Sequence, residues 1–348
     1  MEKLLSSQNK RALKELKSIL DPVWSSPKTG DLPAYDKRVT LSLSKDKASD
    51  EFSICVHVAK KTKWISEEVL PIVEKYDSVF VVSGNGEVQA SYPQSKDVFM
   101  DHATDGRIKP GSSISHGRYR SGTIGCIVEV GKKDEARVYV LTASHVLASN
   151  QANVEENDFI YSPGKGSVNR IIRKYRIGKL SDNMIEIFPE HDNETKDEDI
   201  ELDIDVALVK LDRKHLVSQT LKTVVPDPQN KSEEIHVTKV VSEDNIHQYV
   251  GDEVYIFGAV SGLRKGILSN IYADRMAIKL PNGKKARYKE LFAVTSIDNT
   301  PFSRPGDSGG IIYTKKGELL GFLVGANRYA SYACIGERCL TEFDARLI

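Results

Sequence analysis

Residues 304–313, RPGDSGGIIY, surround one serine hydroxyl with glycines. Ser308 follows Asp307 and precedes Gly309, and an apolar run begins at Ile311. Glycine clusters mark tight turns or places where backbones approach closely. One interpretation is an ordinary hairpin loop before a strand. The other is a nucleophile loop, in which backbone N–H groups face an oxyanion beside the Ser308 hydroxyl.

A serine nucleophile needs a base, and the base needs a group that orients it. His145 is the candidate base, because a strand predicted over residues 138–142 ends just before it. The alternative is a structural histidine in a buried turn. Asp205 in ELDIDVALVKL is the candidate acid, because a carboxylate at the mouth of a buried strand must be paired. An exposed aspartate at the start of a strand is the alternative, and Asp203 replaces Asp205 if the register shifts by two residues.

The order of the three candidates along the chain excludes one fold. His145, Asp205 and Ser308 follow one of the known chain orders for such a triad. Residues 306–310 also match the G-x-S-x-G elbow of α/β-hydrolases, but that fold needs its histidine after the serine. The last histidine of this chain is His247, so an α/β-hydrolase is excluded.

Short strand-like runs recur from about residue 106 onward. Gly, Asn, Asp and Pro separate them, which is typical of a β-sandwich or β-barrel. The main runs are residues 123–130, 138–142, 204–211, 253–257, 276–280, 310–313 and 319–324. We therefore expect one β-rich domain over residues 106–348.

Residues 1–105 predict a small α+β domain without a catalytic cluster. An amphipathic helix is expected to end at Asp21, because Pro22 cannot continue it. A linker follows, and then a ββαββ pattern. Its expected elements are strands at 39–43 and 52–59, a helix at 66–77, and strands at 78–82 and 88–92 around the turn Gly84-Asn85-Gly86.

Composition excludes several classes of function. Lys plus Arg and Asp plus Glu both number 49, and this zero net charge gives no electrostatic argument for a nucleic-acid partner. No apolar stretch is long enough to cross a membrane, and charges interrupt the N-terminal residues where a signal peptide would be apolar.

Four cysteines are too few for a disulfide framework, so we expect reduced thiols and a cytoplasmic location. Cys334 and Cys339 lack a second pair of metal ligands, and the acidic stretch 190–203 lacks the spacing of a calcium loop. We expect no metal and no cofactor.

The motifs TASHVL, DIDVALV and RPGDSGG together resemble the three catalytic motifs of the chymotrypsin/trypsin-like (clan PA) serine proteases. Over residues 110–345 the chain is most similar to the plant Narrow Leaf-type proteases and their bacterial trypsin-like relatives. That likeness rests on SISHGRYRSGTIGCIV, HVLASNQANVEENDFIYSPG, VGDEVYIFGAVSGLRKGIL, PFSRPGDSGG and GELLGFLVGA. The resemblance implies a mainly β fold, with a trypsin-like double β-barrel protease domain after the small α+β (ββαββ) N-terminal domain.

The resemblance also implies the role of each site residue. His145 would be the general base, Asp205 would orient it, and Ser308 would be the nucleophile. The backbone N–H groups of Gly306 and Ser308 would form the oxyanion hole. Asp307 is often the partner of a freed N-terminus in zymogen-type relatives, which here would need a cleavage near residues 118–120.

The sequence departs from the family at several positions. Secreted members carry a cysteine after the catalytic histidine, and here Val146 takes its place, which suits a reduced compartment. Phe302 would lie at the base of the specificity pocket, so the residue before the cleaved bond is expected to be apolar or small. Val324, Gly325 and Ala326 would form the opposite wall and pair with an extended substrate. Val324 replaces the usual serine of that wall.

These features predict an intracellular serine endopeptidase that cleaves protein or peptide substrates. The N-terminal domain would control access to the cleft or recruit a regulatory partner, and no nucleic-acid or membrane partner is expected. Two alternatives stay open: a catalytically silent binding or scaffold protein, and a latent enzyme that needs a trigger to order the loop 301–307. A homo-oligomer also stays open.

Overall fold

In the computed structural model, the described residues fall in ranges separated by short gaps. They are residues 1–25, 39–45, 51–58, 62–76, 79–82, 88–90, 107–116, 121–131, 137–148, 154, 157–164, 175–181, 200–218, 220–230, 232–274, 276–280, 285–298 and 300–348. The predicted linker after the first helix, most of the acidic stretch 190–203 and the domain boundary at residues 105–106 lie outside these ranges.

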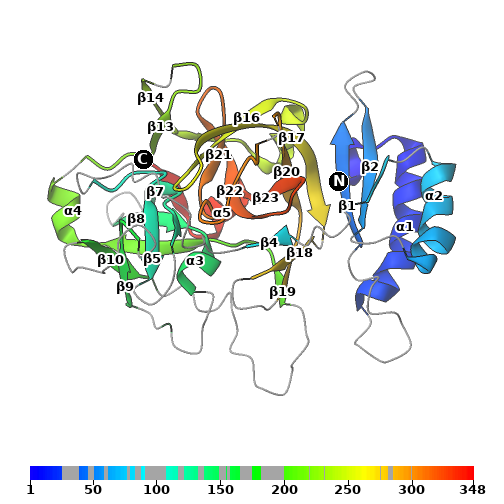
Figure 1. Cartoon of the computed structure of the whole chain (residues 1–348), viewed down its shortest axis with the longest axis horizontal. Helices are drawn as coiled ribbons and strands as arrows, with labels where there is room; N and C mark the ends of the chain where they lie inside the picture. The colour runs from blue at the N-terminus through cyan, green and yellow to red at the C-terminus, as the bar shows by residue number, and fades with distance from the viewer. Residues whose placement is uncertain are drawn as a thin grey trace.

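Six antiparallel strands close on themselves and form a barrel (Figure 1). Each strand pairs with the next around the ring, and the last pairs with the first, so the barrel leaves no free edge where the ring closes. In ring order the strands are β16 (Glu253–Gly258), β17 (Gly262–Asp274), β20 (Leu291–Ser296), β23 (Ala330–Ile335), β22 (Glu318–Ala326) and β21 (Ile311–Thr314).

A second, eight-stranded sheet curls into a half-barrel beside the closed one. Its strand order is β24 (Ala345–Leu347), β7 (Cys126–Val130), β8 (Arg137–Thr142), β12 (Ala207–Leu211), β10 (Arg176–Leu180), β9 (Phe159–Tyr161), β5 (Ser113–His116) and β6 (Gly122–Thr123). Because β24 pairs with β7, the C-terminal strand returns to this half of the molecule. The two sheets confirm the expected mainly β, trypsin-like double β-barrel fold.

Smaller elements connect the barrels. The short helices are α3 (Ser144–Ala148), α4 (Arg213–Ser218), η6 (Glu243–Tyr249) and α5 (Gly336–Glu342). The short strands are β11 (Ile200–Leu202), β13 (Val224–Pro226), β14 (Glu234–His236), β15 (Lys239–Val240), β18 (Met276–Lys279) and β19 (Lys285–Tyr288). Strands β18 and β19 form an antiparallel pair, and β11 adds to β19 in parallel.

The N-terminal residues form a small sheet with helices on its outer face (Figure 1). The elements are η1 (Glu2–Leu4), α1 (Ser7–Ser25), β1 (Val39–Lys45), β2 (Phe52–Val58), the π-helical turn η3 (Ile65–Val69), α2 (Leu70–Lys75) and β3 (Val79–Val82). Strands β1 and β2 are antiparallel, whereas β2 and β3 are parallel and are joined by the helical crossover that parallel strands require.

Two local predictions for this region were wrong. Helix α1 continues through Pro22 to Ser25, because a proline in the last turn removes only one N–H donor and Val23 adds a further buried contact. The expected hairpin between residues 78–82 and 88–92 is also absent among the described residues. Strand β4 (Val88–Gln89) pairs with β18 and β22 instead of β3.

The N-terminal sheet continues directly into the closed barrel through β17. Pairing of β16 with β17 ends at Ile267, which leaves that edge of β17 open farther along the strand. Strand β1 occupies the open edge, with Leu43 opposite Ile271 and Leu41 opposite Asp274. Apolar side chains of α1, β1 and β2 join one buried cluster with those of the barrel, so the small sheet shares a core with the closed barrel.

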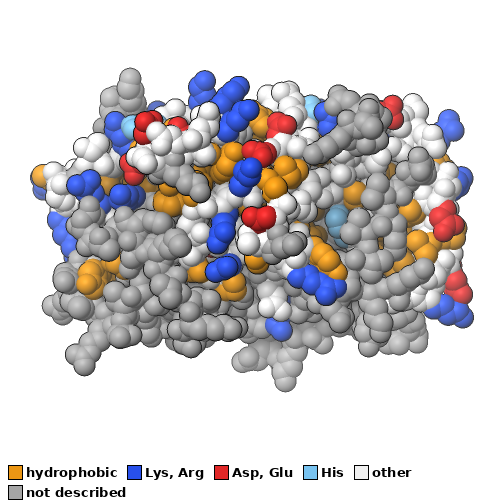
Figure 2. Space-filling view, turned by 45° about the horizontal axis from the view of Figure 1, so that its top comes forward, with side chains coloured by type: hydrophobic (Ala, Val, Ile, Leu, Met, Phe, Trp, Pro, Cys, Tyr) orange, Lys and Arg blue, Asp and Glu red, His pale blue; other side chains and the backbone are white. Residues whose placement is uncertain are grey.

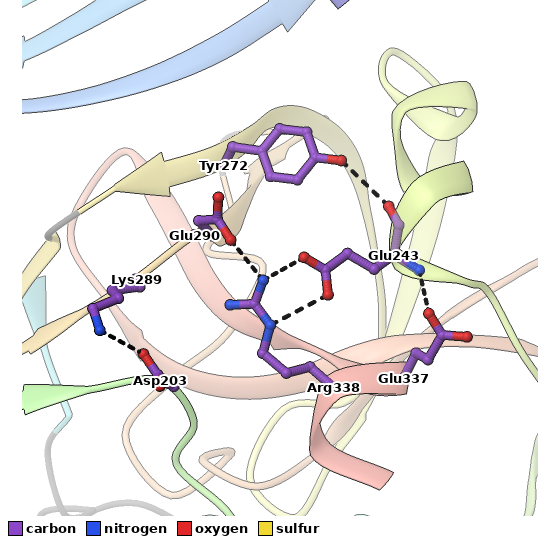
Figure 3. Close-up of polar contacts among 7 residues, drawn as sticks. All are labelled: Asp203, Glu243, Tyr272, Lys289, Glu290, Glu337 and Arg338. Carbon is purple, nitrogen blue, oxygen red and sulfur yellow. Dashed lines mark hydrogen bonds and ion pairs between the residues drawn. The ribbon is translucent and has the colours of Figure 1, made fainter. Parts of the chain in front are cut away.

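An ion network braces the closed barrel next to this junction (Figure 3). Arg338 of α5 binds the carboxylates of Glu243 and Glu290. The Glu243 N–H donates to the Glu337 carboxylate at 2.7 Å, and the Tyr272 hydroxyl donates to the Glu243 carbonyl at 3.3 Å. These contacts hold η6 and α5 against β17.

The described surface carries charges of both signs. On the face in Figure 2, basic and acidic side chains are scattered among apolar ones. Among the described residues, no helix combines the length and the apolar character needed to cross a bilayer.

His57 generates a prediction about the pH dependence of folding. Its Nε2 lies 2.7 Å from the Ser42 hydroxyl, which also accepts a hydrogen bond from Asn270 of β17 at 3.3 Å. Burial lowers the pKa of His57 from 6.5 to about 4. The unfolded chain therefore binds a proton below pH 6.5 that the folded chain does not bind until about pH 4, and stability is lost as the pH falls through this window.

We expect the lowered pKa of His57 to reduce the free energy of unfolding by up to about 3 kcal/mol as the pH falls from 6.5 to 4, since each pKa unit corresponds to about 1.4 kcal/mol. Urea unfolding at several pH values measures this loss. The variant His57→Gln keeps a polar side chain but cannot titrate, so its stability should fall less steeply. Equal pH dependence in both proteins would contradict the assignment.

Candidate active site

Asp205 and His145 are joined by two hydrogen bonds inside the protein. His145 is the second residue of α3, directly after β8, and Asp205 lies between β11 and β12. The His145 backbone N–H donates to Asp205 Oδ1 at 3.0 Å, and the distance from His145 Nδ1 to Asp205 Oδ2 is 2.5 Å. A carboxylate only accepts hydrogen bonds, so Nδ1 carries the proton. In the neutral imidazole, Nε2 is then the basic nitrogen.

Tyr288 is a second side chain that binds the Asp205 carboxylate. Its hydroxyl donates to Asp205 Oδ2 at 3.1 Å from the end of β19. Burial, and then the charge of Asp205, raise the pKa of Tyr288 well above its ordinary value, so the phenol stays protonated and remains a donor. Asp205 and Tyr288 are both fully buried. The buried charge is therefore paired from α3 and from β19, as a buried carboxylate requires.

The alternative acid, Asp203, lies outside this cluster. Its side chain is 64% exposed and pairs with Lys289 at 3.0 Å (Figure 3). The structure therefore brings Asp205, and not Asp203, to His145.

The loop with Ser308 packs against β6, which also contacts the helix that carries His145. The Thr123 N–H donates to the Ser308 carbonyl at 2.8 Å. A Cβ atom at Gly122 would lie 2.3 Å from Val146 Cγ2 and 2.9 Å from the Ser308 carbonyl oxygen. Strand β6 thus touches Ser308 on one side and the residue after His145 on the other. The Ser308 hydroxyl donates a long hydrogen bond of 3.4 Å to the Val324 carbonyl.

Gly309 allows this close packing between the two barrels. Its φ is +86°, and a Cβ atom there would lie 2.3 Å from Thr142 Oγ1 and 2.6 Å from the Ala143 nitrogen. Any larger residue would push Ser308 away from the end of β8. Gly309 therefore lies where two backbones approach closely, as the cluster of glycines in the sequence predicts.

Two backbone N–H groups in the serine loop have no acceptor among the residues that the structure describes. Neither the Gly306 N–H nor the Ser308 N–H donates a hydrogen bond to any described residue. The Gly306 carbonyl is held by the Thr123 hydroxyl at 2.8 Å, and Gly306 has a φ of +101°. The Gly306 and Ser308 N–H groups are the two that the sequence predicts for an oxyanion hole.

The buried carboxylate of Asp307 accepts hydrogen bonds that hold the same loop in place. Its Oδ1 accepts the N–H groups of Val260 and Ser261, both at 2.9 Å, and its Oδ2 accepts the Arg304 N–H at 2.8 Å. Burial raises the pKa of Asp307, and these hydrogen bonds oppose that shift. In this structure, three backbone N–H groups therefore bind the buried Asp307 carboxylate. The cleavage predicted near residues 118–120 falls outside the described residues.

The predicted pocket residues lie around β22 and the segment before Ser308. Phe302 is 3% exposed and packs against the backbone of Gly266, where a Cβ atom would lie 2.7 Å from the ring. Next to it, the buried hydroxyls of Ser303 and Ser331 are 2.7 Å apart. Val324 is fully buried, whereas Ala326 at the end of β22 is partly exposed.

The sequence did not predict that Tyr288 and Thr123 belong to this region. Tyr288 is one of 14 tyrosines, and no local pattern marks it as a partner of Asp205. Thr123 binds the loop through its N–H and its hydroxyl, and that hydroxyl also accepts the Ala259 N–H at 3.0 Å. Only the fold shows that this threonine connects both barrels to the serine loop.

Comparison with known proteins gives similar solved structures but no matching family. No protein-family model and no curated protein matches the chain. Protease A of Thermobifida fusca is similar at 17% identity, over 70% of this chain and 98% of that one, with a TM-score of 0.44. A chymotrypsin of Cellulomonas bogoriensis is similar at 16% identity, over 70% and 98%, with a TM-score of 0.43. A serine protease specific for glutamic acid is similar at 14% identity, over 69% and 100%, with a TM-score of 0.44. The fold assignment itself rests on the strand pairing described above.

Replacing Tyr288 by phenylalanine should destabilise the protein. The variant leaves the buried Asp205 carboxylate with one donor fewer, and a hydrogen bond to a charged group contributes about 1.5–3 kcal/mol. Urea unfolding measures the loss. Tyr313→Phe is the matched control, because this buried hydroxyl donates to the neutral Pro226 carbonyl at 3.0 Å and its loss should cost about 0.5–1.5 kcal/mol. An equal or smaller loss for Tyr288→Phe would contradict the pairing.

Proposed function

We propose that this chain is an intracellular serine endopeptidase that uses Ser308, His145 and Asp205 as a catalytic triad. The observation that carries the proposal is the buried Asp205–His145 pair beside a serine loop with two backbone N–H groups that have no acceptor among the described residues. His145 Nε2 takes the proton of the Ser308 hydroxyl as its oxygen attacks a peptide carbonyl carbon. The N–H groups of Gly306 and Ser308 stabilise the oxyanion that forms. His145 then gives the proton to the leaving amine, and water hydrolyses the acyl-enzyme.

The state of the cysteines supports an intracellular location. All four cysteines are buried free thiols, including Cys334 and Cys339. Burial raises the pKa of Cys55 to about 11 and holds that of Cys126 above its ordinary range. Such thiols are poor nucleophiles, so the serine is the candidate for covalent chemistry. The resemblance to Narrow Leaf-type proteases extends the proposal to cleavage of protein substrates under the control of the N-terminal sheet.

Ser308→Ala should abolish covalent labelling by a fluorophosphonate probe and should lower peptide hydrolysis by about 10⁴-fold or more, as in other enzymes that lose a triad member. Gel fluorescence and a fluorogenic peptide assay measure the two losses. Ser269→Ala is the matched control, because this hydroxyl donates only to the Ala293 carbonyl within the barrel. Folded wild-type protein that neither reacts with the probe nor cleaves any peptide would favour a silent scaffold. Full hydrolysis by Ser308→Ala would disprove the triad.

The pocket generates a prediction about specificity. Phe302 brings an aromatic ring and no charge to the segment before the nucleophile, and the nearby hydroxyls of Ser303 and Ser331 are paired with each other. We expect cleavage after apolar or small residues, since the aromatic ring of Phe302 offers no carboxylate to bind a basic side chain. Profiling on a peptide library measures the preference. Dominant cleavage after Lys or Arg would contradict this prediction.

A further inference from the structure

Strand β4 lies directly against the part of β22 that the proposed protease would offer to its substrate. Gln89 pairs with Ala326 in antiparallel orientation. A Cβ atom at Gly325 would lie 2.8 Å from the Gln89 carbonyl oxygen and 3.1 Å from the Ala90 nitrogen. The two backbones are therefore in close contact at both residues.

The pairing pattern identifies which edge of β22 this is. Strand β23 occupies one edge of β22 from Gly321 opposite Ile335 to Ala326 opposite Ser331. A strand has only two edges, so β4 lies on the other. That other edge pairs first with β21, up to Ile311 opposite Phe322.

Beyond β21, the same edge meets the serine loop. The Leu323 N–H donates to the Gly310 carbonyl at 3.0 Å, and the Leu323 carbonyl accepts the Gly309 N–H at 2.9 Å. The next carbonyl, that of Val324, accepts the Ser308 hydroxyl. Strand β4 therefore sits on the nucleophile's side of β22, two residues past Val324.

An extended peptide that reaches Ser308 along this edge must pair with Gly325 and Ala326, as in other cases of β-strand addition. We propose that β4 is a built-in inhibitory strand that occupies this subsite and must leave before a long substrate can bind. The inference rests on the proposed protease function, and it assigns the regulation of that same site to residues 88–90.

The described part of β4 contacts β22 through one residue pair, Gln89 opposite Ala326. On its other side it pairs in parallel with β18, and the Ala90 N–H donates to the Lys279 carbonyl at 2.9 Å. Val88 and Ala90 are buried, whereas the Gln89 side chain is exposed.

The competing interpretation is that β4 is a permanent part of the working site. The strands β22, β4, β18 and β19 form a continuous strip, and β19 ends at Tyr288, which binds Asp205. If β4 only supports this strip, weakening it should reduce hydrolysis. If it blocks the edge, weakening it should increase hydrolysis, so the two interpretations predict opposite signs.

The test uses Gln89→Pro in the full chain, with Gln89→Ala as its matched control. Proline removes a backbone N–H and is poorly tolerated between two paired strands, whereas alanine changes only an exposed side chain. A strand that occupies the edge nine-tenths of the time weakens apparent substrate affinity about 10-fold. Gln89→Pro should therefore raise kcat/KM for a peptide with four residues before the cleaved bond by about 10-fold, mainly through KM. Gln89→Ala should match the wild type.

A second readout separates this inference from the proposed function. A small fluorophosphonate does not need the β22 edge, so it should label Ser308 at similar rates in all three proteins. Labelled Ser308 with unchanged or reduced peptide hydrolysis in folded Gln89→Pro would overturn the inhibitory strand alone. No labelling of any folded protein would overturn the protease proposal, and the inhibitory strand with it.

Circular dichroism shows whether Gln89→Pro is folded. If it is not, Val88→Asp replaces it, because a charge at this buried position loosens β4 without a backbone change. Its control is Val88→Ile. The same increase in kcat/KM is expected for Val88→Asp alone, and its absence in the folded variant would overturn the inference.

Discussion

The architecture of the candidate site depends on one buried carboxylate. Asp205 has no solvent exposure, and an ionised carboxylate in such a place is costly unless donors surround it. The donors come from two distant elements: His145 in α3 and Tyr288 at the end of β19. The hydrogen bonds that the buried Asp205 carboxylate needs therefore also fix the imidazole of His145. The same requirement ties the half-barrel to the strands that flank the closed barrel.

A second buried acid holds the other half of the site. Asp307 gathers three backbone N–H groups from the loop itself and from the end of β16. Thr123 then links this loop to the half-barrel through both its backbone and its hydroxyl. The placement of the serine loop against the half-barrel thus follows from the pairing of buried polar groups. Two residues past Val324, the edge of β22 next to the serine loop pairs with β4.

Short local patterns in the sequence predicted the mainly β fold and the three triad candidates. A serine among glycines, a histidine after a strand and an aspartate before a strand each carry their signal within a few residues, and the alternating apolar runs predict a mainly β fold. Contacts between distant segments left no such signal. Tyr288 is a tyrosine in a strand like several others, and β4 was expected in a hairpin with residues 78–82. Its actual partners, β18 and β22, are chosen by tertiary packing, because two residues carry too little pattern to specify a pairing.

The most direct test of the proposed triad is a crystal structure of the full chain after reaction with a phosphonate. If Ser308 is the nucleophile, we expect a covalent bond between phosphorus and Ser308 Oγ, with the phosphoryl oxygen within hydrogen-bond distance of the Gly306 and Ser308 N–H groups and His145 Nε2 beside the adduct. Reaction at another residue, or an adduct whose oxygen lies away from both N–H groups and from His145, would contradict it.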